Sequence, residues 1–199
     1  MLKLRKGCRV PFPEKLEEGY EVCGNQITAN VSVDKIEQIM EHFIRIHQEP
    51  LFFILELPTM MTEETEIRPG VVDAFHKDVY YIDGCTPNDA LTVLNKIAKL
   101  AINDGMCAFG FGCHESKDEI VFGKYNVTVI FSKEVSKFDA FFKEHGIEKK
   151  DSLICAWDTF SMDTPGECEK VITDGLDVYS IPGLLAEWGI YKAEKREDS

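Results

Sequence analysis

The chain has 199 residues, 44% of them hydrophobic and 11% aromatic, and a formal net charge of -13 at pH 7. This hydrophobic content excludes an intrinsically disordered chain. The acidic charge disfavours nucleic-acid binding, which needs a basic stripe to replace phosphate counterions. No apolar run reaches the roughly 18 residues of a membrane span, and the first residues lack the apolar segment of a secretory signal. Seven scattered cysteines without a disulfide framework favour a reducing compartment. We therefore expect a cytoplasmic protein that binds neither nucleic acid nor membrane.

Residues 1–30 are predicted to form an irregular leading segment with at most one short strand, because prolines and glycines interrupt it and no long period is visible. Its basic head, which we expect to be solvated, consists of Lys3, Arg5, Lys6 and Arg9. A helix follows, with Ser32 as its N-cap and Pro50 beyond its end. The apolar face of this helix is formed at helical spacing by Ile36, Ile39, Met40, Phe43, Ile44 and His47.

Residues 51–57, with the sequence LFFILEL, are apolar at both alternating sets of positions, which predicts a central strand covered on both faces. Residues 59–69 have no period and are predicted to form a loop. This loop carries three glutamates, Glu63, Glu64 and Glu66. A solvated connection is one interpretation of it, and an acidic binding rim beside the strand is the other.

A short strand at 79–82 precedes the best-marked helix of the chain. Thr86 is a suitable N-cap, Pro87 stands at the first helical position, and Asp89 is placed for a capping box. The apolar face is formed by Leu91, Leu94, Ile97, Ala98, Ala101 and Ile102. Gly105 stands where a glycine commonly ends a helix. The two alanines would allow this helix to lie close to a sheet.

Residues 105–131 are predicted to form an antiparallel β-ribbon. Because strand side chains alternate, one face of its first strand is apolar and consists of Cys107, Phe109, Phe111 and Cys113. The other face is nearly bare and consists of Ala108, Gly110, Gly112 and His114. We expect the alanine-bearing helix to pack on the bare face, although a ligand could also approach it. The apolar parity changes at Gly123-Lys124, which predicts a bulge or tight turn there.

The remaining elements are short. A helix through Phe138 to Phe142 is predicted to end at His145-Gly146, and strands are predicted at 153–157 and 176–181. A closing helical turn is expected before Gly189, and residues 192–199 are expected to form a frayed tail. Strands and helices alternate without a repeat or a composition shift. We therefore predict a single α+β domain over residues 1–199, with helices packed on a mixed or mainly antiparallel sheet.

Cys113 and His114 suggest thiol catalysis, but neighbouring residues on a strand point to opposite faces and cannot form a dyad together. The cysteine and histidine spacings do not match a tetrahedral metal site, and no glycine-rich phosphate-binding motif is present. We therefore predict no metal and no cofactor. If the protein is an enzyme, its site would be assembled near Cys113, His114 and Glu115.

A second acidic segment, residues 158–169, interleaves carboxylates with aromatic side chains, as the rim and core of a protein interface do. A purely structural loop is the other interpretation of this segment. We predict a non-enzymatic module that binds a basic protein partner through this segment and the 59–69 loop. The expected binding residues are Glu63, Glu64, Glu66, Asp158, Asp163 and Glu167. Bacterial immunity proteins, which cover the cationic active sites of nuclease toxins, share this size and charge, although none of their motifs is present. The small enzyme described above is the alternative.

Overall fold

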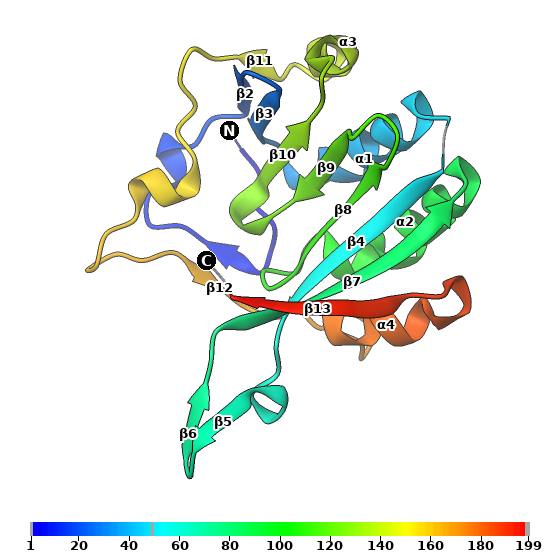
Figure 1. Ribbon diagram of the computed structural model, residues 1–199. Coiled ribbons are helices and arrows are strands. Elements are labelled where there is room, and N and C mark those ends of the chain that lie inside the picture. The colour runs from blue at the N-terminus through cyan, green and yellow to red at the C-terminus, as the bar shows by residue number, and fades with distance from the viewer. Residues whose placement is uncertain (1, 49, 198–199) are drawn as a thin grey trace.

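The computed structural model describes residues 2–48 and 50–197, and it confirms the predicted α+β class. A mixed sheet runs through the molecule in the strand order β11-β2-β3-β10-β9-β8-β4-β7-β13 (Figure 1). Neighbouring strands are antiparallel, except that β11 and β2 are parallel. The strands of this sheet are β2 (Gly19–Cys23), β3 (Gln26–Asn30), β4 (Leu51–Pro58), β7 (His76–Cys85), β8 (Ala108–Cys113), β9 (Glu119–Phe122), β10 (Val127–Phe131), β11 (Glu148–Lys149) and β13 (Tyr191–Glu197).

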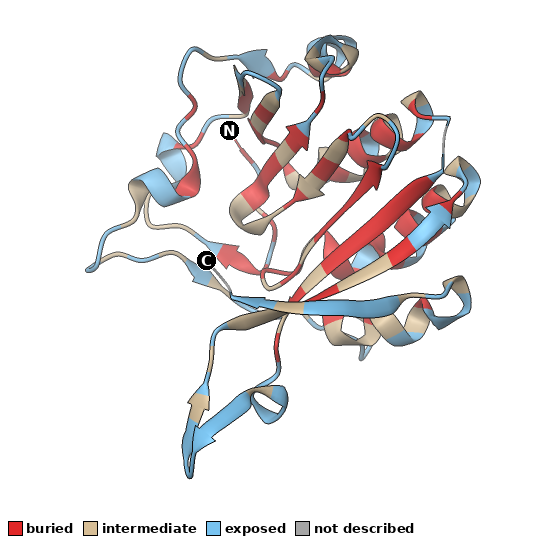
Figure 2. Ribbon diagram, in the orientation of Figure 1, coloured by how far each residue is buried: buried red, intermediate tan, exposed pale blue. Residues whose placement is uncertain are grey.

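Two small ribbons lie outside the sheet. One pairs β1 (Cys8–Arg9) with β12 (Glu167–Cys168), and the other pairs β5 (Thr65–Arg68) with β6 (Val71–Asp73). The second ribbon projects from the body as an exposed arm between β4 and β7 (Figure 2). The helices are α1 (Ile36–Ile46), α2 (Pro87–Ala101), α3 (Asp139–Glu144) and α4 (Ile181–Leu184). None of the helices in the described ranges is both long and apolar enough to cross a membrane.

The helices α1, α2 and α4 lie behind the sheet and share one hydrophobic core with it (Figure 1). Phe53, Phe109 and Phe111 project from β4 and β8 into this core and are fully buried. The α2 helix begins with the predicted capping box, in which Thr86 and Asp89 exchange hydrogen bonds. The predicted N-cap of the first helix is wrong, because Ser32 precedes the 3-10 helix η2 (Val33–Lys35) without a side-chain cap and α1 begins only at Ile36.

The opposite face of β4 carries no covering helix in the described part of the chain (Figure 1). The expectation that this strand is covered on both faces by other elements is therefore wrong. Phe52 and Ile54 are buried there by side chains of the sheet itself, in a cluster with Val79, Tyr81 and Val121. Because large side chains on neighbouring strands shield one another, an open sheet face can still bury apolar residues.

Both predicted irregular ends of the chain form strands, so these two predictions are wrong. Residues 1–30 contain β1, β2 and β3, and a two-residue turn with Gly24 at φ 59° joins the last two. In the predicted frayed tail, residues 192–197 belong to β13, whereas 198–199 lie outside the described residues. The charged side chains of this edge strand do not prevent pairing, because the ladder is made by the backbone.

Two predicted strands in the C-terminal third are also wrong. The segment 153–157 leads into the 3-10 helix η6 (Ala156–Thr159), and 176–181 contains η7 (Val178–Ser180). Asp158 accepts a hydrogen bond from the Cys155 amide, and Asp177 accepts one from the Tyr179 amide. Local aspartate caps of this kind favour turns over strand pairing.

Candidate functional site

The structure separates Cys113 from His114, as the alternation on the strand predicts. Cys113 is 1% exposed and faces the helix-covered core, whereas the side chain of His114 is 71% exposed on the other face. His114 packs beside the ring of Phe52 and approaches Asp83 at 3.4 Å, and Glu115 is exposed in the following turn. The three residues proposed for an enzyme site are therefore not brought together in a catalytic arrangement.

The bare glycine face of β8 does not receive a helix, so the expectation that α2 packs there is wrong. The helices cover the Cys-Phe face instead. A Cβ atom at Gly112 would lie 2.2 Å from the ring of Phe52, and one at Gly110 would lie 1.9 Å from the carbonyl oxygen of Ile120 on β9. Gly112 is therefore needed because the ring of Phe52 lies against it, and Gly110 is needed because the backbone of Ile120 does.

We predict different costs for alanine at these two glycines. Gly110→Ala should lower the free energy of unfolding by about 3 kcal/mol, because the new methyl meets a strand backbone that cannot move independently. Gly112→Ala should cost about 1 kcal/mol, because the ring of Phe52 can turn away. Urea unfolding of both variants measures the difference. Equal costs, or a larger cost at Gly112, would contradict this account of the glycine face.

Charged side chains from several strands meet on the open face beside β8. Glu56 accepts hydrogen bonds from Lys77 at 2.8 Å and from Arg196 at 3.5 Å. Burial and the neighbouring carboxylate of Glu56 raise the pKa of Glu119 above its ordinary value. Sequence reasoning missed this cluster, because its members come from β4, β7, β9 and β13 and no local motif marks them.

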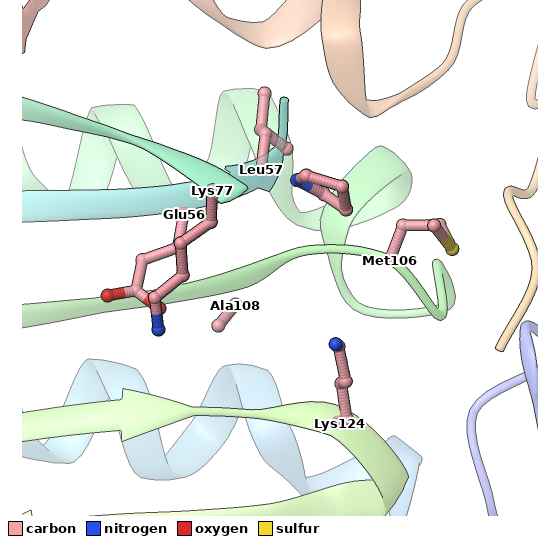
Figure 3. A pocket seen from close by; sticks show the side chains of 7 residues that line it. Glu56, Leu57, Lys77, Met106, Ala108 and Lys124 are labelled. Carbon is pink, nitrogen blue, oxygen red and sulfur yellow. The ribbon is translucent and has the colours of Figure 1, made fainter. Parts of the chain in front are cut away.

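A small cavity lies next to this cluster, and Figure 3 shows Glu56 and Lys77 on one side of it, with Lys124 reaching toward it from the β9–β10 turn. Its volume is about 30 Å³. Such a space holds one or two water molecules and no organic substrate. The two oxygens of Glu56 are also engaged by separate cations. The cluster is therefore an ion-pair network that ties the edge strand β13 to the sheet.

Residues 59–69 form part of the projecting arm, and their glutamates are engaged by other residues of the chain itself. The side chain of Glu64 is 1% exposed and is bound by His76 at 3.0 Å and Lys195 at 3.4 Å. Burial alone would raise the pKa of Glu64, but its bonds to His76 and Lys195 outweigh burial and lower it. Glu63 contacts Lys192, and Glu66 accepts from the Gly70 amide across the turn of the arm. These three glutamates hold the arm in place, and Glu64 is not exposed to a partner.

The chain that leads into the second acidic segment is held against the body by three buried residues. Leu153, Cys155 and Ala156 are buried, the first two against β10 and the third beneath the N-terminal segment. The Asn30 side chain donates to the carbonyl of Ile154 at 2.8 Å, and the Leu153 amide donates to Glu21 at 2.8 Å. The backbone of residues 153–156 is therefore anchored to the body in the absence of a partner.

The outward side of the same segment is apolar and acidic. Ile154 is 49% exposed, Trp157 48% and Met162 100%. Hydrogen bonds between Ser161 and Thr164 close the turn that carries Met162 at its tip. Residues 151–169 contain no lysine or arginine, and their carboxylates are Asp151, Asp158, Asp163, Glu167 and Glu169. We name residues 151–166 the acidic loop and use the name below.

The predicted acidic binding residues in this region differ in their contacts with the rest of the chain. Asp163 is exposed beside Met162, and Asp158 is exposed while one of its oxygens caps η6. Glu167 lies beyond the loop, where Arg9 approaches it at 3.8 Å.

Comparison with protein-family models, curated proteins and solved structures finds no match to this chain, so its function has to be inferred from its own geometry.

Proposed function

We propose that the protein is a binding module for a basic protein partner, and that the acidic loop is the centre of its interface. The observation that carries the proposal is the exposure of Trp157 and Met162 on a firmly anchored loop without a single cation. Tryptophan and methionine are enriched in the cores of protein interfaces, and carboxylates around them would form a rim complementary to lysine and arginine. The net charge of -13 supports the same class of partner.

Anchoring also supports binding at this loop. A loop that is ordered before association loses less conformational entropy when the partner arrives. The arm contributes further exposed apolar side chains, although its glutamates are occupied by cations and amides of the chain itself. The interface is therefore proposed on the acidic loop, with Asp158 and Asp163 as its charged rim and Glu167 at its margin.

A nuclease toxin is the specific partner class that we propose, because its active site must be cationic to bind phosphates. An acidic loop that covers such a site would neutralise it without any chemistry of its own. This function would be exerted in the cytoplasm, where seven free thiols would persist. Inhibition of the partner's nuclease activity at a one-to-one ratio is the expected readout.

The experiment starts from a chain that carries a photo-crosslinking residue at position 157, because this position lies at the centre of the proposed interface. Mass spectrometry identifies the captured protein, and stopped-flow mixing measures association of the purified pair at increasing salt. We expect a basic partner whose association rate falls steeply with ionic strength. Capture of a neutral or acidic protein, or salt-independent association, would exclude the proposed charge complementarity.

Trp157→Ala is predicted to weaken this binding by about 2 kcal/mol, roughly thirtyfold in Kd, because an interface tryptophan commonly dominates the binding energy. Asp163→Asn should instead slow association with little change in dissociation. Met61→Ala on the arm is the matched control, since Met61 is 64% exposed outside the acidic loop. If the Met61 variant weakened binding as much as the Trp157 variant, the interface would have to be placed on the arm.

A further inference from the structure

We propose that Cys8 and Cys168 form a reactive dithiol, which a low-molecular-weight disulfide such as oxidised glutathione converts into an intramolecular disulfide. Their sulfur atoms lie 3.6 Å apart although 160 positions separate them in the chain. The two residues stand directly opposite each other in the β1–β12 ribbon. This site is independent of the proposed binding function, and its test requires no partner.

The backbone pattern places the two side chains at the favourable kind of strand position. The Glu169 amide donates to the carbonyl of Gly7 at 2.8 Å, so the neighbouring pair is the hydrogen-bonded one. Cys8 and Cys168 therefore form a non-hydrogen-bonded pair, in which the Cα atoms and side chains of an antiparallel ribbon come closest. The Cα separation typical of such a pair, about 4.5 Å, lies within the range of about 4.4–6.8 Å found between disulfide-linked cysteines.

A junction of three backbone segments fixes this pair. A Cβ atom at Gly7 would lie 2.2 Å from the amide nitrogen of Gly105 and 2.5 Å from the carbonyl oxygen of Glu169. The Gly105 amide donates to the Glu169 carbonyl at 3.0 Å, and the Gly7 amide donates to the Asn103 carbonyl at 2.8 Å. Gly105, which the sequence indicated as a helix-ending residue, serves this contact instead. The backbone contacts of the native fold therefore hold the two cysteines next to each other.

The two thiols have different roles in the exchange. Cys8 is 5% exposed, whereas Cys168 is half-buried in an open depression that Gly7, Arg9, Glu167 and Glu169 also line. The hydrogen bond from Cys8 outweighs burial and lowers the pKa of Cys168 to about 6, with further help from Tyr125, Lys124 and Arg5. The same hydrogen bond, together with burial, raises the pKa of Cys8. Cys168 is thus the thiolate that a dissolved disulfide can reach.

The exchange proceeds in two steps. The Cys168 thiolate attacks one sulfur of oxidised glutathione, the glutathione S–S bond breaks, and one glutathione thiolate leaves. Cys8 then loses its proton and attacks the Cys168 sulfur of the mixed disulfide, which releases the second glutathione thiolate. Two protein thiols are oxidised to one disulfide, one glutathione disulfide is reduced, and the two protons pass to the released thiolates.

The remaining cysteines are poorer candidates for thiol–disulfide exchange than Cys168, and a metal site does not explain the Cys8–Cys168 pair. Burial raises the pKa of Cys85 to about 11, that of Cys107 to about 12 and that of Cys155 to about 11. Such thiols are poor nucleophiles at neutral pH. Across the described residues, no group of three or more potential ligand side chains is placed to hold a metal. Two paired sulfurs without further ligands favour thiol–disulfide exchange.

The test incubates the full native chain with oxidised glutathione and maps the products by peptide mass spectrometry. We expect a link between residues 8 and 168. Cys8→Ser should stop at the mixed disulfide on Cys168, and Cys168→Ser should leave Cys8 unmodified because it is buried. Cys23→Ser is the matched control, since Cys23 is exposed on β2, outside the β1–β12 ribbon, and this variant should form the link as the wild-type chain does.

The rate of alkylation of Cys168 by iodoacetamide provides a second readout. Its pH midpoint in the folded chain should lie below that in the urea-unfolded chain, where the thiol has the free value of about 8.5. Tyr125→Phe should raise the folded midpoint, because it removes the hydroxyl that stabilises the thiolate. The proposal is overturned if the native wild-type chain forms no 8–168 link, or if the unfolded chain forms it equally well.

Discussion

Replacing Asp118 with alanine is expected to lower the free energy of unfolding by about 3–5 kcal/mol, because it removes the anion from a buried ion cluster. Asp118 accepts from His47 at 2.9 Å and from Lys137 at 2.9 Å. The side chains of Asp118 and His47 are both 2% exposed, whereas that of Lys137 is 29% exposed and can turn to solvent. The main cost therefore comes from the histidine, which has no route to water.

The ring of His47 is engaged at both of its nitrogens. Its Nδ1 lies 2.7 Å from the carbonyl oxygen of Phe43, and its Nε2 lies 2.9 Å from the Asp118 carboxylate. Without Asp118, the buried imidazole keeps only one of these two partners, and a buried polar group left without a partner is costly.

The effect of the Asp118 variant should depend on pH. Burial alone would raise the pKa of Asp118, but bonds from His47, Lys137 and Ser132 outweigh it and hold the pKa below the ordinary value of 3.8. A lowered carboxyl pKa contributes stability that is complete above the ordinary value and is lost as pH falls through the folded value. The difference between wild type and Asp118→Ala should therefore shrink below about pH 4.

Urea unfolding at neutral pH and in steps down to acid measures both expectations, and thermal unfolding should show a Tm lower by about 6–20 °C. Glu115→Ala is the matched control, because Glu115 is exposed in the same turn, and it should change stability by less than about 0.5 kcal/mol. A variant difference that stayed constant through acid pH would show that Asp118 acts by packing and not by charge.

The elements that sequence reasoning predicted correctly are those whose signals are local. The capping box of Thr86 and Asp89 marks the start of α2 within a few residues. The alternation through β8 and the parity change at Gly123 reveal an antiparallel ribbon, whose tight turn holds Tyr125 at φ 56°. In both cases the residues that specify the structure are neighbours in the chain.

The features that escaped prediction depend on contacts between distant residues. The charged tail pairs with β7 only because that strand offers a free edge, and nothing within residues 191–197 signals it. Glu64 looks like any solvated acid until Lys195 and His76 enclose it. Cys8 and Cys168 meet from opposite ends of the chain. Composition gives the net charge of -13, but only the fold shows which carboxylates are already occupied and which face outward.

The same limit applies to the basic head, where the structure buries a residue that we expected to be solvated. Arg5 is only 1% exposed. Its guanidinium donates to the carbonyl oxygens of Ala101 at 2.6 Å and Gly123 at 3.0 Å, and a further bond reaches the carbonyl of Cys107. It also lies 4.5 Å from the centre of the Phe122 ring. One side chain thus joins the N-terminal segment to the last residue of α2 and to two loops.

Arg5→Ala is therefore expected to lower the free energy of unfolding by about 3–5 kcal/mol, because it leaves buried carbonyl oxygens without donors and opens a cavity above Phe122. Arg5→Lys should recover only part of this loss. A single ammonium cannot reproduce the planar fork that reaches separate carbonyls and stacks on a ring. Lys6→Ala, at the exposed neighbouring position, is the control and should stay within about 0.5 kcal/mol of wild type.

The Arg5 variants also report on the thiol pair, because the positive charge of Arg5 contributes to the low pKa of Cys168. Arg5→Lys, which keeps a positive charge, should change the alkylation midpoint of Cys168 less than Arg5→Ala does. Urea unfolding and alkylation of the same samples separate the two effects, since the first responds to the lost hydrogen bonds and the second to the lost charge. If Arg5→Ala unfolded at the wild-type urea concentration, the guanidinium would not be a structural anchor, and the N-terminal segment would have to be held by its backbone bonds alone.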